Sequence, residues 1–123
     1  MKDLISTFKV LSDKNRTRII LMLKIRPLCV CEIYEVLNIA LSTISAHLKL
    51  MKNAGIIEAT KDGRWVIYDL SRGTSFTERL IENLENELRD DPVVKNDRVK
   101  ISKITREICS SKFQNTKNID TQV

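Results

Sequence analysis

The order of patterns between Pro27 and Leu70 constrains the fold of this chain more than any other feature. Two segments with the apolar spacing of short helices follow one another across a three-residue connection, and a strand–turn–strand pattern comes directly afterwards. Two short helices joined by so short a turn and followed by a hairpin are typical of the winged helix-turn-helix. The sequence therefore predicts a mainly α fold with a small β-hairpin.

The second helix of this pair has the clearer boundaries. Ser42 is a favourable first residue, and Ile44, Leu48 and Met51 recur with the spacing of one buried helical stripe. Gly55 supplies the left-handed residue that commonly follows the end of a helix. A helix is therefore expected from Ser42 to the residue before Gly55.

The predicted hairpin follows at once, in the segment IIEATKDGRWVIYDL. Its two strand-like runs flank Asp62-Gly63, a pair that favours a tight type I′ turn. Trp65 and Tyr68 lie in the second run, where we expect them to pack the hairpin against the rest of the domain.

Further helices are predicted on both sides of this centre. Their expected ranges are 2–11, 13–24, 76–88 and 92–109, and the expected caps of the last three are Ser12, Ser75 and Asp91. The outer helices carry more apolar surface than so small a centre can cover. We expect that surface to pair with a second copy, which predicts a homodimer formed through the N- and C-terminal helices.

A chain of 123 residues, 42% of them hydrophobic, is large enough for one compact domain with its own core. That domain is expected to span residues 1–109. Residues 110–123 are polar and are expected to form a flexible tail.

Several functional classes are not expected from this sequence. No apolar run approaches the roughly 20 residues that span a bilayer, and the N-terminus lacks the pattern of a secretory signal. A cytoplasmic protein without a membrane partner is therefore expected. We recognise no nucleophile–base set, phosphate-binding loop or hydrolase metal motif, so the chain is not expected to be an enzyme.

The face of the 42–54 helix opposite its buried stripe carries small hydroxyl side chains near its start and cations further along. Such a face suits the major groove, because short side chains approach the bases closely while lysines neutralise phosphates. A net charge of +5 agrees with double-stranded DNA as the partner. The candidate DNA-binding residues are Ser42, Thr43, Ser45, His47, Lys49 and Lys52 in the helix and Lys61 and Arg64 in the hairpin.

Simpler interpretations apply to the same residues. Charged side chains on a helix are often only a solvated face, and a winged helix can also serve protein contacts alone. His47 is the single histidine of the chain; a histidine in such a helix is more often packed or hydrogen-bonded, but we expect it at the edge of the DNA-facing surface. One histidine cannot build a histidine-rich zinc site.

The three cysteines are the candidate metal ligands. Cys29 and Cys31 lie two apart at the expected start of the helix before the DNA-reading helix, and Cys109 ends the last helix. Reduced thiols in a cytoplasmic protein are metal-binding, redox-active or simply packed. Because positions i and i+2 of an ideal helix point about 200° apart, we expect an ion bound to Cys29 and Cys31 to distort the first helical turn.

Four segments, in this order, resemble the ArsR/SmtB family of metal-responsive repressors. They are FKVLSDKNRTRIILML, LCVCEIYEVL, STISAHLKLMKNAGII and KDGRWVIYDL, between Phe8 and Leu70. The resemblance implies a homodimeric winged-helix repressor that leaves its operator when a metal or metalloid binds, with Arg64 on the wing. Leu41 and Ala46 stand where many members of the family carry polar residues, which affects the operator sequence rather than DNA binding.

The LCVCE segment resembles the arsenic-sensing and lead/cadmium-sensing subgroups. This implies Cys29 and Cys31 as ligands of an effector, with no required cofactor. Several arsenic sensors have a third thiol where this chain has Tyr34, so Cys109 is the candidate third ligand, from its own or the partner subunit. Three sulfurs suit trivalent arsenic or antimony. Cadmium, lead and thiol oxidation are the alternatives, while the zinc-sensing subgroup needs C-terminal histidines that this chain lacks.

Overall fold

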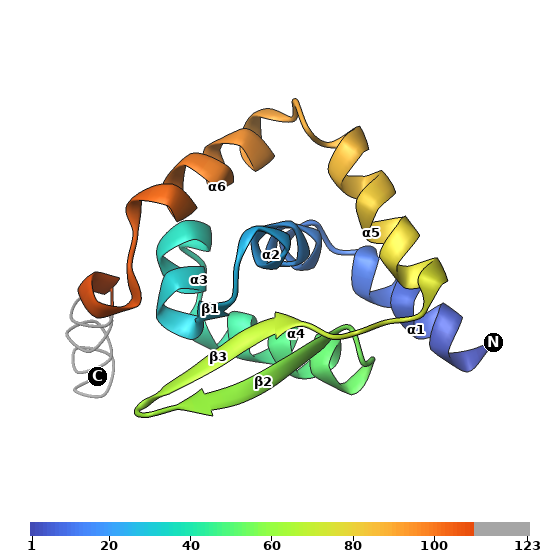
Figure 1. Ribbon diagram of the computed structural model, residues 1–123, viewed down its shortest axis with the longest axis horizontal. Coiled ribbons are helices and arrows are strands. Elements are labelled where there is room, and N and C mark those ends of the chain that lie inside the picture. The colour runs from blue at the N-terminus through green and yellow to red at the C-terminus, as the bar shows by residue number, and fades with distance from the viewer. Residues whose placement is uncertain (110–123) are drawn as a thin grey trace.

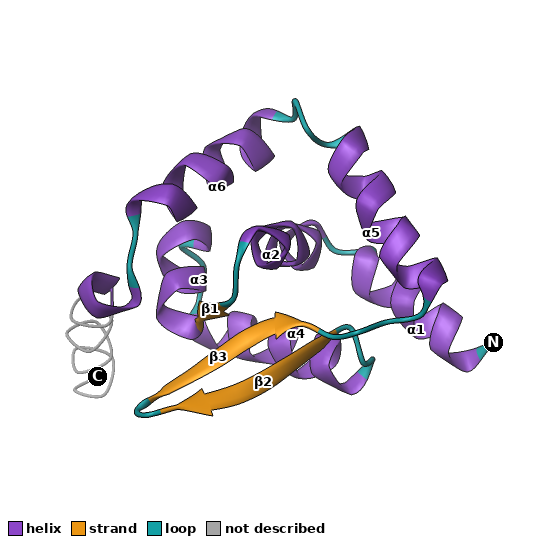
Figure 2. Cartoon of the chain, in the orientation of Figure 1, coloured by secondary structure: helices purple, strands orange, loops and turns teal. Residues whose placement is uncertain are grey.

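The computed structural model of the protein describes residues 1–109, which form a group of helices with a hairpin on one side (Figures 1 and 2). The elements are α1 (Lys2–Leu11), α2 (Lys14–Ile25), β1 (Leu28–Cys29), α3 (Val30–Leu37), α4 (Leu41–Asn53), β2 (Ile57–Asp62), β3 (Trp65–Leu70), α5 (Ser75–Glu87) and α6 (Pro92–Lys103). Residues 106–109 add one helical turn. Among residues 1–109, no helix has both the length and the apolar character needed to cross a membrane. The predicted tail, 110–123, lies outside the described residues.

The core lies where α2, α3 and α4 meet. In Figure 1, α2 passes through the centre, with α5 and α6 arching over one side and the hairpin β2–β3 on the other. Ile19, Ile33 and Ile44, one from each central helix, have no exposed surface. α3 and α4 are joined by residues 38–40, where Asn38 takes a left-handed φ of 52° that asparagine adopts more readily than most residues. The predicted winged helix-turn-helix is confirmed.

The turn of the hairpin lies one position later than predicted. Asp62 pairs with Trp65 across the two strands, so the turn residues are Gly63 and Arg64. Gly63 has a φ of 60°. A glycine at the first turn position is typical of a type II′ turn rather than the expected type I′.

The sheet has a third strand that was not predicted. β1 pairs antiparallel with β3, which gives the order β1-β3-β2, and its register places Cys29 opposite Ile67. Two residues are too few to show the alternation by which a strand is recognised in a sequence. This short strand attaches the residue that precedes α3 directly to the wing.

Two helix caps differ from the expected ones by one residue. Asp13 rather than Ser12 caps α2, because its carboxylate accepts two backbone N–H groups of the first turn at 2.8 and 3.1 Å. Thr74 rather than Ser75 caps α5 through its hydroxyl. α4 likewise begins one residue before the predicted start, whereas Asp91 caps α6 as expected.

The last helix is shorter than predicted. α6 ends at Lys103, and Ile104 is extended, so the expected continuous helix over 92–109 is wrong. Arg26 holds this end, since its guanidinium donates to the carbonyl oxygens of Ile101 and Ile104 at 3.2 and 3.0 Å. These carbonyl oxygens have no partner within the helix and are satisfied from outside it. The chain then forms the separate turn 106–109, which carries Cys109.

The outer surface of α1 and of the start of α5 is apolar. Leu4, Ile5, Phe8 and Phe76 are between 40% and 58% exposed. The rings of Phe8 and Phe76 meet edge to face, with their centroids 6.3 Å apart. This surface lies where the sequence predicts pairing with a second copy, and the homodimer stays a prediction.

A buried ion pair ties α6 to α2. The guanidinium of Arg18 donates through Nε and Nη2 to the two carboxylate oxygens of Asp97, each at 2.9 Å. Asp97 is only 3% exposed. A pair with two parallel hydrogen bonds fixes direction as well as distance, so it sets the orientation of α6.

Replacing Asp97 with alanine is expected to lower the free energy of unfolding by about 3 kcal/mol, because it leaves the half-buried guanidinium of Arg18 without its partner. Chemical denaturation followed by circular dichroism measures this change. Asp90→Ala is the matched control, since the side chain of Asp90 is 90% exposed and 4.0 Å from Lys95; it should change the free energy by less than about 0.5 kcal/mol. Equal effects would contradict a special role for the buried pair.

Candidate functional site

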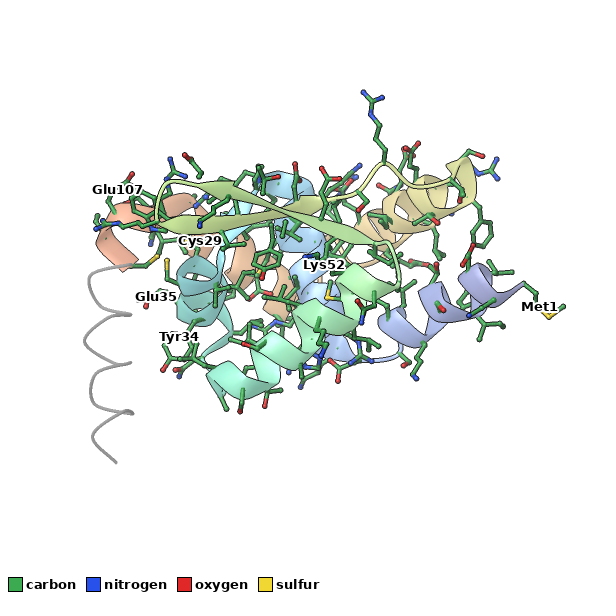
Figure 3. All side chains as sticks on the ribbon, turned by 90° about the horizontal axis from the view of Figure 1, so that it is seen from below. Met1, Cys29, Tyr34, Glu35, Lys52 and Glu107 are labelled. Atoms are coloured by element: carbon green, nitrogen blue, oxygen red, sulfur yellow. The ribbon has the colours of Figure 1, made fainter. Side chains whose placement is uncertain are left out.

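The three cysteines of the chain come together in one cluster. The Sγ of Cys31 lies 2.7 Å from that of Cys29 and 3.0 Å from that of Cys109. All three sulfurs lie within 4.8 Å of one another. Figure 3 shows Cys29 near Glu107, at the end of the molecule where the hairpin turns. Cys29 comes from β1, Cys31 from the first turn of α3 and Cys109 from the turn 106–109, so one chain supplies all three thiols.

The backbone at the start of α3 explains how two cysteines two apart can face one point. Cys29 is the N-cap of α3 and has extended dihedrals, φ −88° and ψ 166°. It is therefore not a helical residue, and the 200° separation expected for i and i+2 does not apply. The prediction that an ion must distort this turn to reach both Cys29 and Cys31 is wrong.

Glu32 fixes this arrangement from within the first turn of α3. Its Oε1 accepts the backbone N–H of Cys29 at 3.0 Å, while the thiol of Cys29 faces the backbone N–H of Glu32, which forms a reciprocal capping box. The Oε2 of Glu32 forms an ion pair with Arg26 at 2.7 Å. Since Arg26 also holds the end of α6, this buried carboxylate connects α3 to the segment that leads to Cys109.

The cluster is covered by the wing. Trp65 and Ile67 of β3 pack against the three cysteines, whose exposed fractions are only 2% to 5%. A hollow of about 450 Å³ lies beside this cover, and Glu32, Ile67 and Arg106 are among its lining residues. The sulfurs are therefore shielded from bulk water by a small number of side chains.

The environment of Cys29 and of Cys109 keeps these two thiols protonated. The hydrogen bond with Cys31 raises the pKa of Cys29, and burial raises it further. Burial also raises the pKa of Cys109 to about 11. At neutral pH these groups are therefore uncharged S–H donors rather than thiolates.

The candidate DNA-binding residues lie on two neighbouring elements. Lys52 lies on α4, which Figure 3 shows below the hairpin. At the tip of the wing, the guanidinium of Arg64 lies 4.5 Å from the centre of the Trp65 ring. The exposed members of the predicted set are Ser42, Thr43, Ser45, Lys49, Lys52, Lys61 and Arg64.

His47 does not lie at the edge of this exposed face, contrary to expectation. The residue is only 9% exposed, and its Nδ1 is 3.0 Å from Nη1 of Arg16 on α2. The same guanidinium donates to the carbonyl oxygen of Val10 at 2.9 Å. The histidine is thus a packed residue that joins α4 to the junction of α1 and α2, and we do not expect it to contact DNA.

Three residues around the cluster were not predicted to belong to the site. They are Glu32, Trp65 as a cover of the sulfurs, and Arg106. Glu32 follows Cys29 by three positions, which is the spacing of a capping box, but cysteine is not among the cap residues by which that motif is recognised. Arg106 had no signal in the sequence, since its contacts depend on the break after α6.

Residues 13–59 match the family model described as "Bacterial regulatory protein, arsR family". The chain belongs to the arsR family. The matched residues run from the cap of α2 into β2, so they include Cys29 and Cys31 but neither Cys109 nor the tip of the wing.

Two curated relatives illustrate this arsR-family similarity. The "Cadmium resistance transcriptional regulatory protein CadC homolog" of Staphylococcus aureus is 39% identical over 69 residues, which are 55% of this chain and 57% of that protein. The "Arsenical resistance operon repressor" of Escherichia coli (strain K12) is 40% identical over 68 residues, 54% of this chain and 58% of that protein. The chain thus matches somewhat more than half the length of each.

A solved structure agrees on the fold. It is the homodimeric winged helix-turn-helix DNA-binding domain of Mb0332 from Mycobacterium bovis, described as a possible ArsR-family transcriptional regulator. The TM-score is 0.61 with 22% sequence identity, over 74% of this chain and 82% of that one.

The thiols of the native arsR-family chain should react with iodoacetamide slowly at pH 7.5, because they are buried and only the thiolate is reactive. For Cys109, with a pKa of about 11, the rate should still rise between pH 9 and 10. In the urea-unfolded chain, the rate for Cys109 should level off once the pH exceeds the ordinary cysteine pKa of about 8.5. Mass spectrometry of the modified peptides measures both rates. A native rate that levels off by pH 9 would contradict the proton-retaining environment.

Proposed function

We propose that this arsR-family chain is a homodimeric, DNA-binding transcriptional repressor that releases its operator when trivalent arsenic or antimony binds Cys29, Cys31 and Cys109. The observation that carries the proposal is the convergence of three buried sulfurs from three segments of one chain. Packing alone seldom brings every cysteine of a chain together. A three-sulfur site for a thiophilic ion requires such convergence.

The distances suit a single ion. Bonds from sulfur to a metal of similar size are about 2.3 Å long, so one ion holds its sulfurs within about 4.6 Å of each other. The three thiols already lie within 4.8 Å. The sulfurs of Cys29 and Cys31, 2.7 Å apart, and those of Cys31 and Cys109, 3.0 Å apart, would have to move apart to surround one ion, and the third ligand comes from the same subunit as the first two.

Charge balance favours trivalent arsenic or antimony over cadmium or lead. Arsenite at neutral pH is the uncharged As(OH)₃. Each thiol exchanges its S–H bond for an S–As bond, and its proton leaves with one hydroxide as water, so three waters depart and the site stays neutral. Three thiolates around Cd²⁺ or Pb²⁺ would instead leave a net charge of −1 in a buried site, which is unfavourable without a free cation nearby.

The cations beside the cluster are already engaged. Arg26 is paired with Glu32, and Arg106 is paired with Asp62, each at 2.7 Å. Neither guanidinium is therefore a ready counter-charge for an anionic complex. The named functions of the relatives include both arsenical and cadmium resistance, so this electrostatic argument, and not similarity, favours the metalloid.

Sensing of an oxidant through a disulfide is a second candidate function, and the distance between the sulfurs of Cys31 and Cys109 supports it. Cys31 and Cys109 have their sulfurs 3.0 Å apart, and a bond between them needs an oxidant that removes two electrons and both thiol protons. A disulfide between Cys29 and Cys31 is less favourable because of the strain in so small a ring. Release of DNA by peroxide but not by arsenite would favour this alternative.

The DNA-facing residues suit operator binding by the dimer. The exposed hydroxyls and lysines of α4 enter a major groove, while Lys61 and Arg64 reach the flanking backbone. Two such surfaces would be joined by the apolar faces of α1 and α5 in a homodimer; the Mb0332 domain is itself described as homodimeric. Half-sites about one helical turn apart are then expected.

Arsenite is expected to bind with a stoichiometry of one per chain and to release DNA. Cys29→Ser, Cys31→Ser and Cys109→Ser should each weaken binding by more than the roughly 10- to 100-fold that loss of an outer-shell partner costs a metal site. X-ray absorption should count three sulfurs around arsenic in the wild type and two in Cys109→Ser. The proposal fails if the Cys29→Ser, Cys31→Ser double variant still releases DNA on addition of arsenite.

Arsenite and cadmium should differ in how their affinity for the chain depends on pH. Arsenite affinity should be nearly constant between pH 6 and 8, because no net proton is released. Cadmium affinity should rise by up to about a thousandfold per pH unit, since three protons leave. Tighter binding of Cd²⁺ than arsenite at pH 7 would point to a cadmium sensor instead.

Lys49→Ala combined with Lys52→Ala should weaken binding to DNA from upstream of its own gene. Loss of two phosphate contacts should reduce the slope of log affinity against log salt concentration by about 2. Fluorescence anisotropy at several salt concentrations measures this slope. Lys95→Ala combined with Lys100→Ala removes the same charge from exposed positions on α6 and should leave the slope unchanged. Equal slopes for all three proteins would contradict the assigned surface.

A further inference from the structure

Arg106 contacts the thiol cluster with its backbone and the wing with its side chain. Its carbonyl oxygen lies 4.0 Å from the Sγ of Cys31 and 3.8 Å from that of Cys109, and both thiols are directed to it as donors. Its Nη1 donates to Oδ2 of Asp62 at 2.7 Å. Its guanidinium also lies 4.7 Å from the centre of the Trp65 ring.

The wing contacts of Arg106 enclose the tip of the hairpin. Asp62 is the last residue of β2, Trp65 is the first of β3, and the two are paired across the strands. The turn between them carries Arg64, whose guanidinium lies over the same indole ring. Arg106 thus holds both ends of the turn that presents a candidate DNA-binding residue.

We propose that Arg106 is the positioning residue that couples occupancy of the three thiols to the position of the wing. This inference rests on the proposed function. In the free protein, the sulfurs of Cys31 and Cys109 are in weak contact with the carbonyl oxygen of Arg106, and the thiol of Cys109 also donates to the Sγ of Cys31. Binding of a metalloid removes both S–H donors and fixes Cys109 to the other two sulfurs.

The turn 106–109 transmits this change because it is short. The backbone N–H of Cys109 donates to the carbonyl oxygen of Thr105 at 3.1 Å, so Cys109 and Arg106 belong to one hydrogen-bonded turn. A shift of the thiol therefore also moves the guanidinium that holds Asp62 and Trp65. The wing changes its position relative to α4, and the two DNA-facing surfaces no longer fit together.

The test compares the effect of arsenite on DNA affinity in Arg106→Gln and in the wild type. An allosteric coupling of ordinary size makes wild-type binding about 5- to 150-fold weaker with arsenite. Arg106→Gln should bind arsenite with unchanged stoichiometry. Arsenite should then weaken DNA binding by this variant by less than about threefold. Arg106→Lys keeps the charge opposite Asp62 and should restore part of the effect. Arg89→Gln makes the same change at an exposed position of the chain and should behave as wild type.

Binding is followed on the same samples through Trp65, the single tryptophan of the chain, which packs on the cluster. Asp62→Asn removes the same contact from the side of the wing and should also reduce the effect of arsenite on DNA affinity. This second variant keeps the test decisive if Arg106→Gln fails to fold. Full release of DNA by arsenite in folded, arsenite-binding Arg106→Gln or Asp62→Asn would overturn the coupling and leave the sensor intact. If arsenite does not bind the wild type, the proposed function falls, and the coupling falls with it.

Discussion

The candidate site depends on one buried carboxylate, that of Glu32. It receives the backbone N–H of Cys29 on one oxygen and forms an ion pair with Arg26 through the other. A carboxylate with 2% exposure needs a partner of opposite charge, and Arg26 supplies it beside Oε2, which accepts no hydrogen bond from the described residues. The start of α3, Arg26 and the end of α6 are therefore held in one arrangement. Cys29 and Cys31 lie at one end of this network, and Cys109 follows the other.

The thiol cluster and the wing form one structural unit. Cys29 is paired with Ile67 in the sheet, and the side chains of Trp65 and Ile67 cover the sulfurs. α4 is attached differently, through the 38–40 turn after α3. A DNA-binding domain that uses both α4 and the wing is sensitive to their relative position, because both must contact the same duplex at once. A site built into the wing side of this arrangement is well placed to control that position.

Local patterns were sufficient for most of the elements but not for their ends. The stripe of Ile44, Leu48 and Met51 is buried as its spacing predicted. Ser12 and Asp13 can both cap a helix; in the structure Asp13 accepts the first-turn N–H groups of α2, while the Ser12 hydroxyl donates to the carbonyl oxygen of Lys9. The side chain of His47 was misplaced as well. Its partner Arg16 lies 31 residues earlier, and no spacing within α4 contains that contact.

The sequence by itself determined the winged helix-turn-helix, the closeness of Cys29 and Cys31 and the exposed cations, because each rests on neighbouring residues and on helical or strand periodicity. Only the tertiary structure decided that Cys109 joins its own chain's pair, that no distortion is needed to bring Cys29 and Cys31 together, and that Arg106 reaches the wing. These depend on the break after Lys103 and on contacts between residues up to 78 positions apart. Long-range contacts of this kind are set by how the buried ion pairs and the core orient whole helices, which local propensity does not specify.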